Sequence, residues 1–219
     1  MATKEVLADL AAQFQHASGQ AVTLQSVGGV DVAKRVQAGE LVDVVVLAAN
    51  AIEQLMKDGK LLAGSRADLA RSGIAVAVRA GAPVPAIASE GAVKQAVLAA
   101  RTLSYSTGPS GVYLVQLFQR WGIYEQIAGK IVQAPPGVPV GSLVARGEVE
   151  LGFQQLSELL HLPGITVLGP LPAEIQSITI FSGAIATYAS QPRAARALLD
   201  FMRAPSSDAA KRRHGMEPA

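Results

Sequence analysis

The chain has 219 residues, of which 50% are hydrophobic and 16% are charged, and its formal net charge is +2. This length allows a sizeable core in one or two domains, while the charge excess is too small to indicate nucleic-acid binding. The absence of cysteine excludes disulfides, thiolate zinc sites and a cysteine nucleophile.

The first part of the chain predicts helices that alternate with strands. Apolar residues recur at helical spacing after Thr3, which can cap that helix, and Gly19 ends it. A continuous β-branched run later predicts a buried strand. In chain order we predict helices at 3–17, 31–38 and 50–59, and strands at 21–26, 42–48 and 73–80.

Prolines in "GAPVPA" interrupt this pattern, and the alternation then begins again. We predict helices at 89–100, 110–121, 139–146, 192–203 and 206–213, and strands at 102–106, 130–134, 149–155, 165–172 and 177–187. Such alternation indicates the α/β class with parallel sheets. Two series separated by proline-containing crossings predict two lobes, residues 1–81 plus 175–219 and residues 82–174.

Three turns between a strand and a helix combine small residues with a helix start: residues 1–4, "SVGGVD" and "STGPSG". A helix start offers unpaired N–H groups and a partial positive charge, which together can bind an anion. In open α/β sheets, ligands bind beyond the carboxyl ends of the strands. The candidate ligand-binding residues in these turns are Thr3, Lys4, Gly28, Gly29, Ser106, Thr107, Ser110 and Gly111.

Each of these turns also has a simpler interpretation, in which serine, threonine and glycine only cap a helix. In "YSTGPSGVY" we expect the helix to begin at about Ser110. As part of an anion site, Gly108 and Gly111 would let a ligand approach the backbone. As a cap, Ser110 would serve only the helix.

Several catalytic motifs are absent from the sequence. No Gly-Lys-Ser/Thr follows a glycine-rich loop, the three-glycine spacing of a dinucleotide site is missing, and there is no Gly-x-Ser-x-Gly elbow. His16, His161 and His214 have no acidic or second-histidine partner at ligand spacing. We therefore expect no metal site and no cofactor.

The stretch "VLADLAAQFQHASGQAVTLQSVGGVDVAKRVQAGELVDVVVLAANAIEQLMKDGKL", with the later "PSGVY", "LGFQQ" and "GPLP", resembles the molybdate-binding periplasmic protein family. The resemblance covers essentially the whole chain. It implies a type II periplasmic-binding-protein fold of two lobes, each a mostly parallel sheet flanked by helices. It also implies a ligand held in the interlobe cleft by hinge closure, and a membrane permease of the ABC-transporter type as partner.

The chain departs from this family at the ligand. Where the family holds its oxyanion through two serine hydroxyls, this sequence has Ala2 and Gly29, and Gln155 stands where the family carries a ligand tyrosine. Backbone donors with serine and glutamine side chains suit a larger organic anion. We therefore expect a di- or tricarboxylate rather than molybdate, and Gln155 joins the ligand-binding candidates.

One branch of the family contains aconitate isomerase, which moves a proton between trans- and cis-aconitate without a cofactor. The resemblance therefore implies an alternative function, a cofactor-free isomerase of an unsaturated tricarboxylate. That reaction needs cations for the carboxylates and one base near the allylic carbon. The residues considered are Lys4, Arg79, Tyr105, Glu158 and Glu174, and of these Lys4 and Glu158 are the catalytic candidates.

The start of the chain bears on its location. The family opens with a strand before the first helix, whereas Met1 falls almost where that strand should end. "MATKEVLADL" has charges where a signal peptide would be apolar, and no apolar run approaches the roughly 20 residues of a membrane span. We expect a periplasmic protein if a signal peptide and first strand were removed, a cytoplasmic one otherwise, and no membrane insertion.

Overall fold

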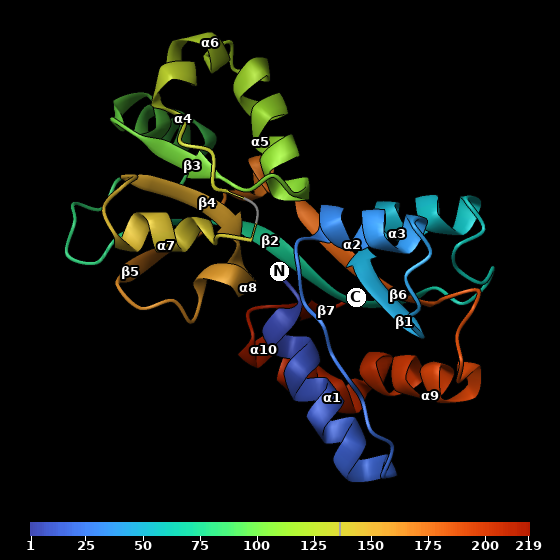
Figure 1. The fold of residues 1–219 in the computed structure, drawn as a ribbon. Helices are drawn as coiled ribbons and strands as arrows, with labels where there is room; N and C mark the ends of the chain where they lie inside the picture. The colour runs from blue at the N-terminus through green and yellow to red at the C-terminus, as the bar shows by residue number, and fades with distance from the viewer. Residues whose placement is uncertain (136) are drawn as a thin grey trace. The chain divides into compact units, whose positions relative to one another are not determined.

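The computed structural model describes residues 1–135 and 137–219. The chain forms two compact units, unit 1 with Met1–Ser72 and Thr179–Ala219, and unit 2 with Gly73–Ile178 (Figure 1). Strand β2, Ala67–Arg79, begins in unit 1 and continues into unit 2. The lobe limits expected from the prolines, at 81/82 and 174/175, stay a prediction.

Unit 1 is an α/β unit whose strands are joined by helices and 3-10 turns. Strand β6 lies between β1 and the first part of β2, β1 runs antiparallel to β6, and β7 pairs antiparallel with β2. Besides the start of β2, its elements are α1 (Lys4–Ser18), α2 (Gly29–Gln37), β1 (Val44–Ala48), α3 (Ala49–Lys57), β6 (Ile178–Ile185), α9 (Pro192–Arg203), η3 (Pro205–Ser207), α10 (Asp208–Arg213) and β7 (Glu217–Pro218).

Helices cover both faces of the unit 1 sheet, as Figure 1 shows. Alternate residues of a strand point to opposite faces. Val46 and Phe181 therefore pack on the α1, α9 and α10 side, where Leu199 is fully buried, whereas Val45 and Leu47 pack with helices α2 and α3. This two-sided burial explains the continuous apolar run that predicted β1.

Unit 2 is built on the second part of β2, which pairs antiparallel with β4 and β5, while β3 runs parallel to β4. Its other elements are α4 (Glu90–Ala99), β3 (Leu103–Tyr105), α5 (Pro109–Arg120), α6 (Tyr124–Ile127), η1 (Ala128–Lys130), α7 (Val140–Ala145), β4 (Leu151–Gln155), α8 (Leu156–Leu159), β5 (Ile165–Pro170) and η2 (Ala173–Ile175). The larger core joins the sheet to α4, α5 and α6 around Phe118 and Phe153, which are both fully buried. Helices α7 and α8 pack on smaller clusters that contain Val144 and Leu159.

The structure confirms the α/β class and corrects three details. The sheets are mixed rather than mostly parallel, since β1 pairs antiparallel with β6 and β2 with β4. Residues 21–26 form no strand and are mostly exposed, and no described strand pairs with them. In place of the strand predicted at 130–134, Lys130 ends η1 and Ile131 forms an isolated bridge to Leu103.

Among the described residues, no helix has both the length and the apolar character that crossing a membrane requires.

Candidate functional site

The turn "YSTGPSGVY" joins β3 to α5. Helix α5 begins at Pro109, one residue before the predicted start, because proline has no N–H to leave unpaired and its fixed φ suits the first helical position. Gly108 is the N-cap, in extended conformation, and no side chain makes a capping hydrogen bond. Ser110 lies inside the first turn, so the interpretation of Ser110 as a helix cap is wrong.

Two hydroxyls and two amides gather at this helix start. The Oγ atoms of Ser106 and Ser110 are 3.0 Å apart, and the Ser106 Oγ also accepts from the Gly108 N–H at 3.3 Å. Within the described chain, the N–H groups of Ser110 and Gly111 have no hydrogen-bond partner. Ser110 is buried, Ser106 is half-buried and Thr107 is exposed. The turn therefore holds unused backbone donors beside a buried hydroxyl.

The structure explains why glycine occupies position 111, which the sequence analysis did not foresee. A Cβ atom at this position would lie 1.6 Å from the carbonyl oxygen of Ser106 and 3.2 Å from the Tyr105 ring. Glycine is required here so that the chain can pass from β3 into α5. The expected role of Gly111, close approach of a ligand, is not needed to explain this residue. A Cβ on Gly108 would meet nothing closer than 3.6 Å.

The end of β4 lies beside the end of β3, because Tyr105 pairs in parallel register with Phe153. Gln154 and Gln155 follow Phe153, and each is only 3% exposed. Because side chains alternate across a strand, the two glutamines point to opposite faces of the sheet. The predicted candidates Ser106, Ser110 and Gln155 are thus brought to one edge of the unit 2 sheet.

Gln154 is a buried polar residue that sequence reasoning passed over. Its Oε1 accepts from the backbone N–H of Val140, the first residue of α7, at 2.9 Å. The signal that could have found it is a pair of glutamines at the end of a buried strand, "QQ", with Ser157 and Glu158 shortly after it.

Glu158 is the acidic candidate of this edge. It lies half-buried in α8, and burial raises the pKa of its carboxyl. The hydroxyl of the neighbouring Ser157 is buried and has no hydrogen-bond partner in the described part of the chain. A buried polar group without a partner is rare in a native fold. The start of α8 therefore places a perturbed carboxyl beside a free hydroxyl.

Unit 1 holds the other four predicted ligand residues. Lys4 is exposed and lies 3.6 Å from Glu5. Thr3 is the N-cap residue of α1, as predicted, but its side chain makes no capping hydrogen bond. Gly28 and Gly29 form the start of α2. A Cβ on Gly28 would lie 3.3 Å from the Asp31 carboxylate, so this helix start already has an acidic side chain beside it.

The remaining isomerase candidates have other roles. Tyr105 belongs to the core of unit 2, and burial, followed by the effect of the neighbouring Tyr124, raises its pKa to about 12. Glu174 accepts from the backbone N–H of Glu90 at 3.1 Å. Arg79 ends β2 and is exposed. A phenol with so high a pKa is a poor base near neutral pH, which leaves Glu158 as the better placed group in unit 2.

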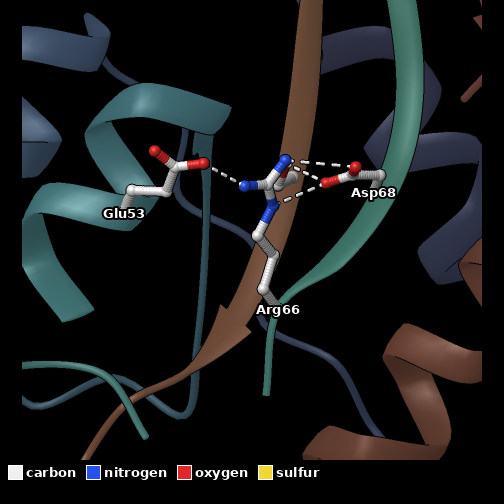
Figure 2. A network of polar contacts seen from close by, with 4 residues as sticks. Glu53, Arg66 and Asp68 are labelled. Atoms are coloured by element: carbon white, nitrogen blue, oxygen red, sulfur yellow. Dashed lines mark hydrogen bonds and ion pairs between the residues drawn. The ribbon is translucent and has the colours of Figure 1, made fainter. Parts of the chain in front are cut away.

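The charged network shown in Figure 2 has a structural role. Arg66 donates to Asp68 at 2.8 and 3.1 Å and also pairs with Glu53 of α3. The buried Ser182 of β6 donates to the same carboxylate at 2.6 Å. These contacts connect α3, β2 and β6, and the positive charge of Arg66 is already paired within unit 1.

No group of three or more metal-ligating side chains occurs among residues 1–135 and 137–219. The Asp9 carboxylate lies 3.0 Å from the His214 Nε2 atom and also accepts from Arg213 at 2.9 Å. This cluster joins α1 to the end of α10. It contributes to the packing of unit 1.

Comparison with known proteins places the chain in a family. The family model described as "Bacterial extracellular solute-binding protein" matches residues 1–217. The chain belongs to this family. It is 44% identical to an aconitate isomerase of a Pseudomonas species over 178 residues, which are 81% of this chain and 67% of that protein.

Two further comparisons involve molybdate-binding proteins. This solute-binding protein is 29% identical to the molybdate-binding protein ModA of Azotobacter vinelandii over 210 residues, 91% of the chain and 80% of that protein. The solved structure of the Azotobacter vinelandii periplasmic molybdate-binding protein superimposes with a TM-score of 0.80 at 23% identity, covering 98% of this chain and 94% of that one. The fold is that of the type II periplasmic binding proteins, as the sequence predicted.

Proposed function

We propose that this solute-binding protein captures a small organic anion, a di- or tricarboxylate, at the edge of the unit 2 sheet where β3 and β4 end. The observation that carries the proposal is the start of α5, where the N–H groups of Ser110 and Gly111 are unused within the described chain. Such donors, with the partial positive charge of a helix of this length, favour a carboxylate.

The side chains at this edge favour an organic anion over a compact oxyanion. The hydroxyls of Ser106 and Ser110 and the amide of Gln155 can donate to carboxylate oxygens, each over a different part of a larger ligand. In unit 1, Ala2 and Gly29 offer no hydroxyl, whereas the resemblance implies serines there. The aconitate isomerase is also the more similar of the two relatives.

A second function is favoured by the position of Glu158, namely the cofactor-free isomerisation of an unsaturated tricarboxylate. In this reaction, a base removes a proton from the allylic methylene carbon, the electron pair of that C–H bond shifts the double bond, and a proton is added to the former vinyl carbon. This proton shift consumes no oxidant and no co-substrate, and it needs no metal. The raised pKa of the Glu158 carboxyl suits a group that accepts and returns a proton near neutral pH.

Binding and conversion can be tested with the same protein sample. Titration calorimetry with cis-aconitate, trans-aconitate and citrate should give heats of binding, and sulfate and molybdate serve as inorganic comparisons. Each aconitate isomer is then incubated with the protein in D₂O and followed by proton NMR. Conversion of one isomer to the other, with deuterium entering the methylene group, supports the isomerase. Binding without conversion or exchange supports a transport protein, and no binding of any carboxylate contradicts both.

Two consequences follow for partners and location. As a transport protein, the chain would deliver its ligand to a membrane permease of the ABC type, and the candidates Thr3, Lys4, Gly28 and Gly29 of unit 1 would take part in holding it. The family description, an extracellular solute-binding protein, supports a location in the periplasm. Fractionation of cells that produce the protein under its own promoter would test this location.

A further inference from the structure

We propose that the side-chain amide of Gln176 is a positioning residue for ligand capture, and that it acts through the two chain segments that connect the units. The chain leaves unit 1 after Ser72, within β2, and returns to it at Thr179, within β6. Gln176 joins these two segments inside unit 2. The inference rests on the proposed function, in which residues of both units hold the ligand, and it concerns the connection between the units rather than the contacts with the ligand.

The regular pairing of β2 with β5 ends just before Gln176 takes over. The ladder reaches the pair of Ala75 and Pro170. One step further, the N–H of Leu171 donates to the Ile74 carbonyl at 2.9 Å. A regular antiparallel pair of this kind would exchange a second bond, from the Ile74 N–H to the Leu171 carbonyl. The amide of Gln176 takes the place of that second bond.

Gln176 bonds to both partners of the interrupted pair. Its Oε1 atom accepts from the Ile74 N–H at 2.8 Å, and its Nε2 atom donates to the Ile74 carbonyl at 3.0 Å and to the Leu171 carbonyl at 3.3 Å. The Oε1 atom also accepts from the N–H of Ser177 at 2.9 Å. Both acceptor and both donor positions of the amide are thus used, which fixes its orientation. Because Ile74 is fully buried, its backbone groups need these partners.

The glycine before Ile74 makes room for this amide. A Cβ atom on Gly73 would lie 3.0 Å from both the Cδ and the Nε2 atoms of Gln176, and 3.2 Å from the Cδ1 atom of Ile178. These distances are shorter than an ordinary van der Waals contact. Gly73 is the first residue of unit 2 on β2, and Ile178 is its last residue before the chain returns to unit 1. The amide therefore lies where the two connecting segments approach each other.

This arrangement orders both connecting segments before a ligand arrives. A segment whose backbone groups are already paired loses little further freedom at capture, whereas an unpaired segment must be ordered at that moment. Loss of the amide should therefore weaken binding, although Gln176 is not among the residues proposed to contact the ligand. The alternative is a purely structural role, in which a substitution lowers stability and leaves the affinity unchanged.

The first test combines hydrogen exchange with calorimetry on the whole protein. Gln176→Met keeps the length of the side chain and removes all four bonds. The amide protons of Ile74 and Ser177 should then exchange about tenfold faster or more, as loss of one hydrogen bond predicts. Other slow amide protons of the unit 2 sheet should accelerate only as far as the fall in global stability requires. The affinity for cis-aconitate, trans-aconitate or citrate, whichever binds the parent best, should fall by about threefold to tenfold.

The matched control is Thr102→Val, which also removes a side-chain bond to the backbone of unit 2. The Thr102 hydroxyl accepts from the N–H of Glu150 at 3.1 Å, at the start of β3 and outside both connecting segments. Valine keeps the shape of threonine, so the variant should lose stability in urea denaturation. Its carboxylate affinity and its exchange rate at Ile74, corrected for that loss, should equal those of the parent.

Gln176→Glu provides a rescue by protonation, and it also decides the question if Gln176→Met does not fold. The ionised carboxylate keeps an acceptor for Ile74 and Ser177 but turns its second oxygen toward two carbonyl groups. The protonated carboxyl can donate there, as the amide does. A half-buried position facing two carbonyls favours the protonated form. The affinity of this variant relative to the parent at the same pH should therefore be low at about pH 8 and recover toward about pH 5.

The outcomes separate the inference from the proposed function. Faster exchange at Ile74 together with weaker binding supports the inference. Faster exchange with unchanged affinity shows that Gln176 only stabilises the connection, and it overturns the positioning role, as does an unchanged exchange rate at Ile74. If the parent binds none of the three carboxylates, the proposed function fails, and the exchange rates alone then decide whether Gln176 joins the two segments.

Discussion

Replacing Gly111 by alanine tests the main structural finding at the candidate site. The added Cβ would lie 1.6 Å from the Ser106 carbonyl oxygen, whereas ordinary contacts are about 3.5 Å, so the junction of β3 and α5 must open by about 2 Å. Overpacking of this kind typically costs 1–3 kcal/mol, and loss of the Ser106–Ser110 hydrogen bond adds roughly 1 kcal/mol. Alanine also restricts the unfolded chain more than glycine does, which offsets only about 0.4–1 kcal/mol of this loss.

The expected net result for Gly111→Ala is a loss of about 2–3 kcal/mol in the free energy of unfolding. The matched control is Gly91→Ala, since Gly91 also lies in the first turn of a unit 2 helix and its Cβ would meet nothing within 4 Å. That variant should gain about 0.4–1 kcal/mol. Urea denaturation followed by circular dichroism measures both. Equal stability of the two variants would refute the argument that Ser106 requires glycine at position 111.

Three further outcomes are expected. Ser110→Ala should lower stability by about 0.5–1.5 kcal/mol through loss of its bond to Ser106, and it should weaken tricarboxylate binding about tenfold or more in calorimetry; unchanged affinity would remove Ser110 from the site. Molybdate should bind weakly or not at all, and a dissociation constant below about 1 μM, some 8 kcal/mol of binding, would contradict this. Hydrogen bonds from Gln13, Arg213 and His214 lower the pKa of Asp9 from its ordinary value of 3.8 to about 2. The ionised Asp9 therefore adds about 2 kcal/mol to the free energy of unfolding above pH 3.8, and this contribution is lost as the pH falls toward 2. In urea denaturation at several pH values, Asp9→Asn should lose less stability between about pH 4 and about pH 2 than the parent. An equal loss in both proteins would contradict this prediction.

Helix prediction succeeded where local chemistry decides the structure. Apolar spacing predicted α1, and Gly19 ends it with a left-handed conformation of φ 71° while its N–H bonds to the Gln15 carbonyl. A proline at the first helical position likewise accounts for the start of α9. These signals lie within a few residues of each other in the chain, so a single sequence contains them.

Strand prediction failed where a distant partner decides the structure. The segment at 21–26 has strand-like composition, but a strand needs a neighbouring strand to pair its backbone groups, and none of the described strands pairs with it. The direction of pairing is also set by topology. The apolar run of β1 correctly indicated burial on both faces, but its neighbour β6 runs antiparallel to it. Neither result can be obtained from the residues of the strand alone.

The candidate site shows the same difference between local and distant causes. The sequence identified the turn after β3 as unusual, because Ser106, Ser110 and Gly111 are close in the chain. It could not show that Gly111 is required by the Ser106 carbonyl, since this depends on the angle at which α5 leaves the sheet. It also passed over Gln154, whose partner Val140 is 14 residues earlier in the chain.

Binding and isomerisation make opposite demands on Glu158, and this difference connects the two proposed functions. An ionised carboxylate repels an anionic ligand, so a pure binding protein gains affinity when Glu158 is neutral. An isomerase must instead ionise the same group during each cycle. Burial raises the pKa of Glu158 and so favours the neutral form that suits binding, whereas an isomerase would have to ionise the group against that burial.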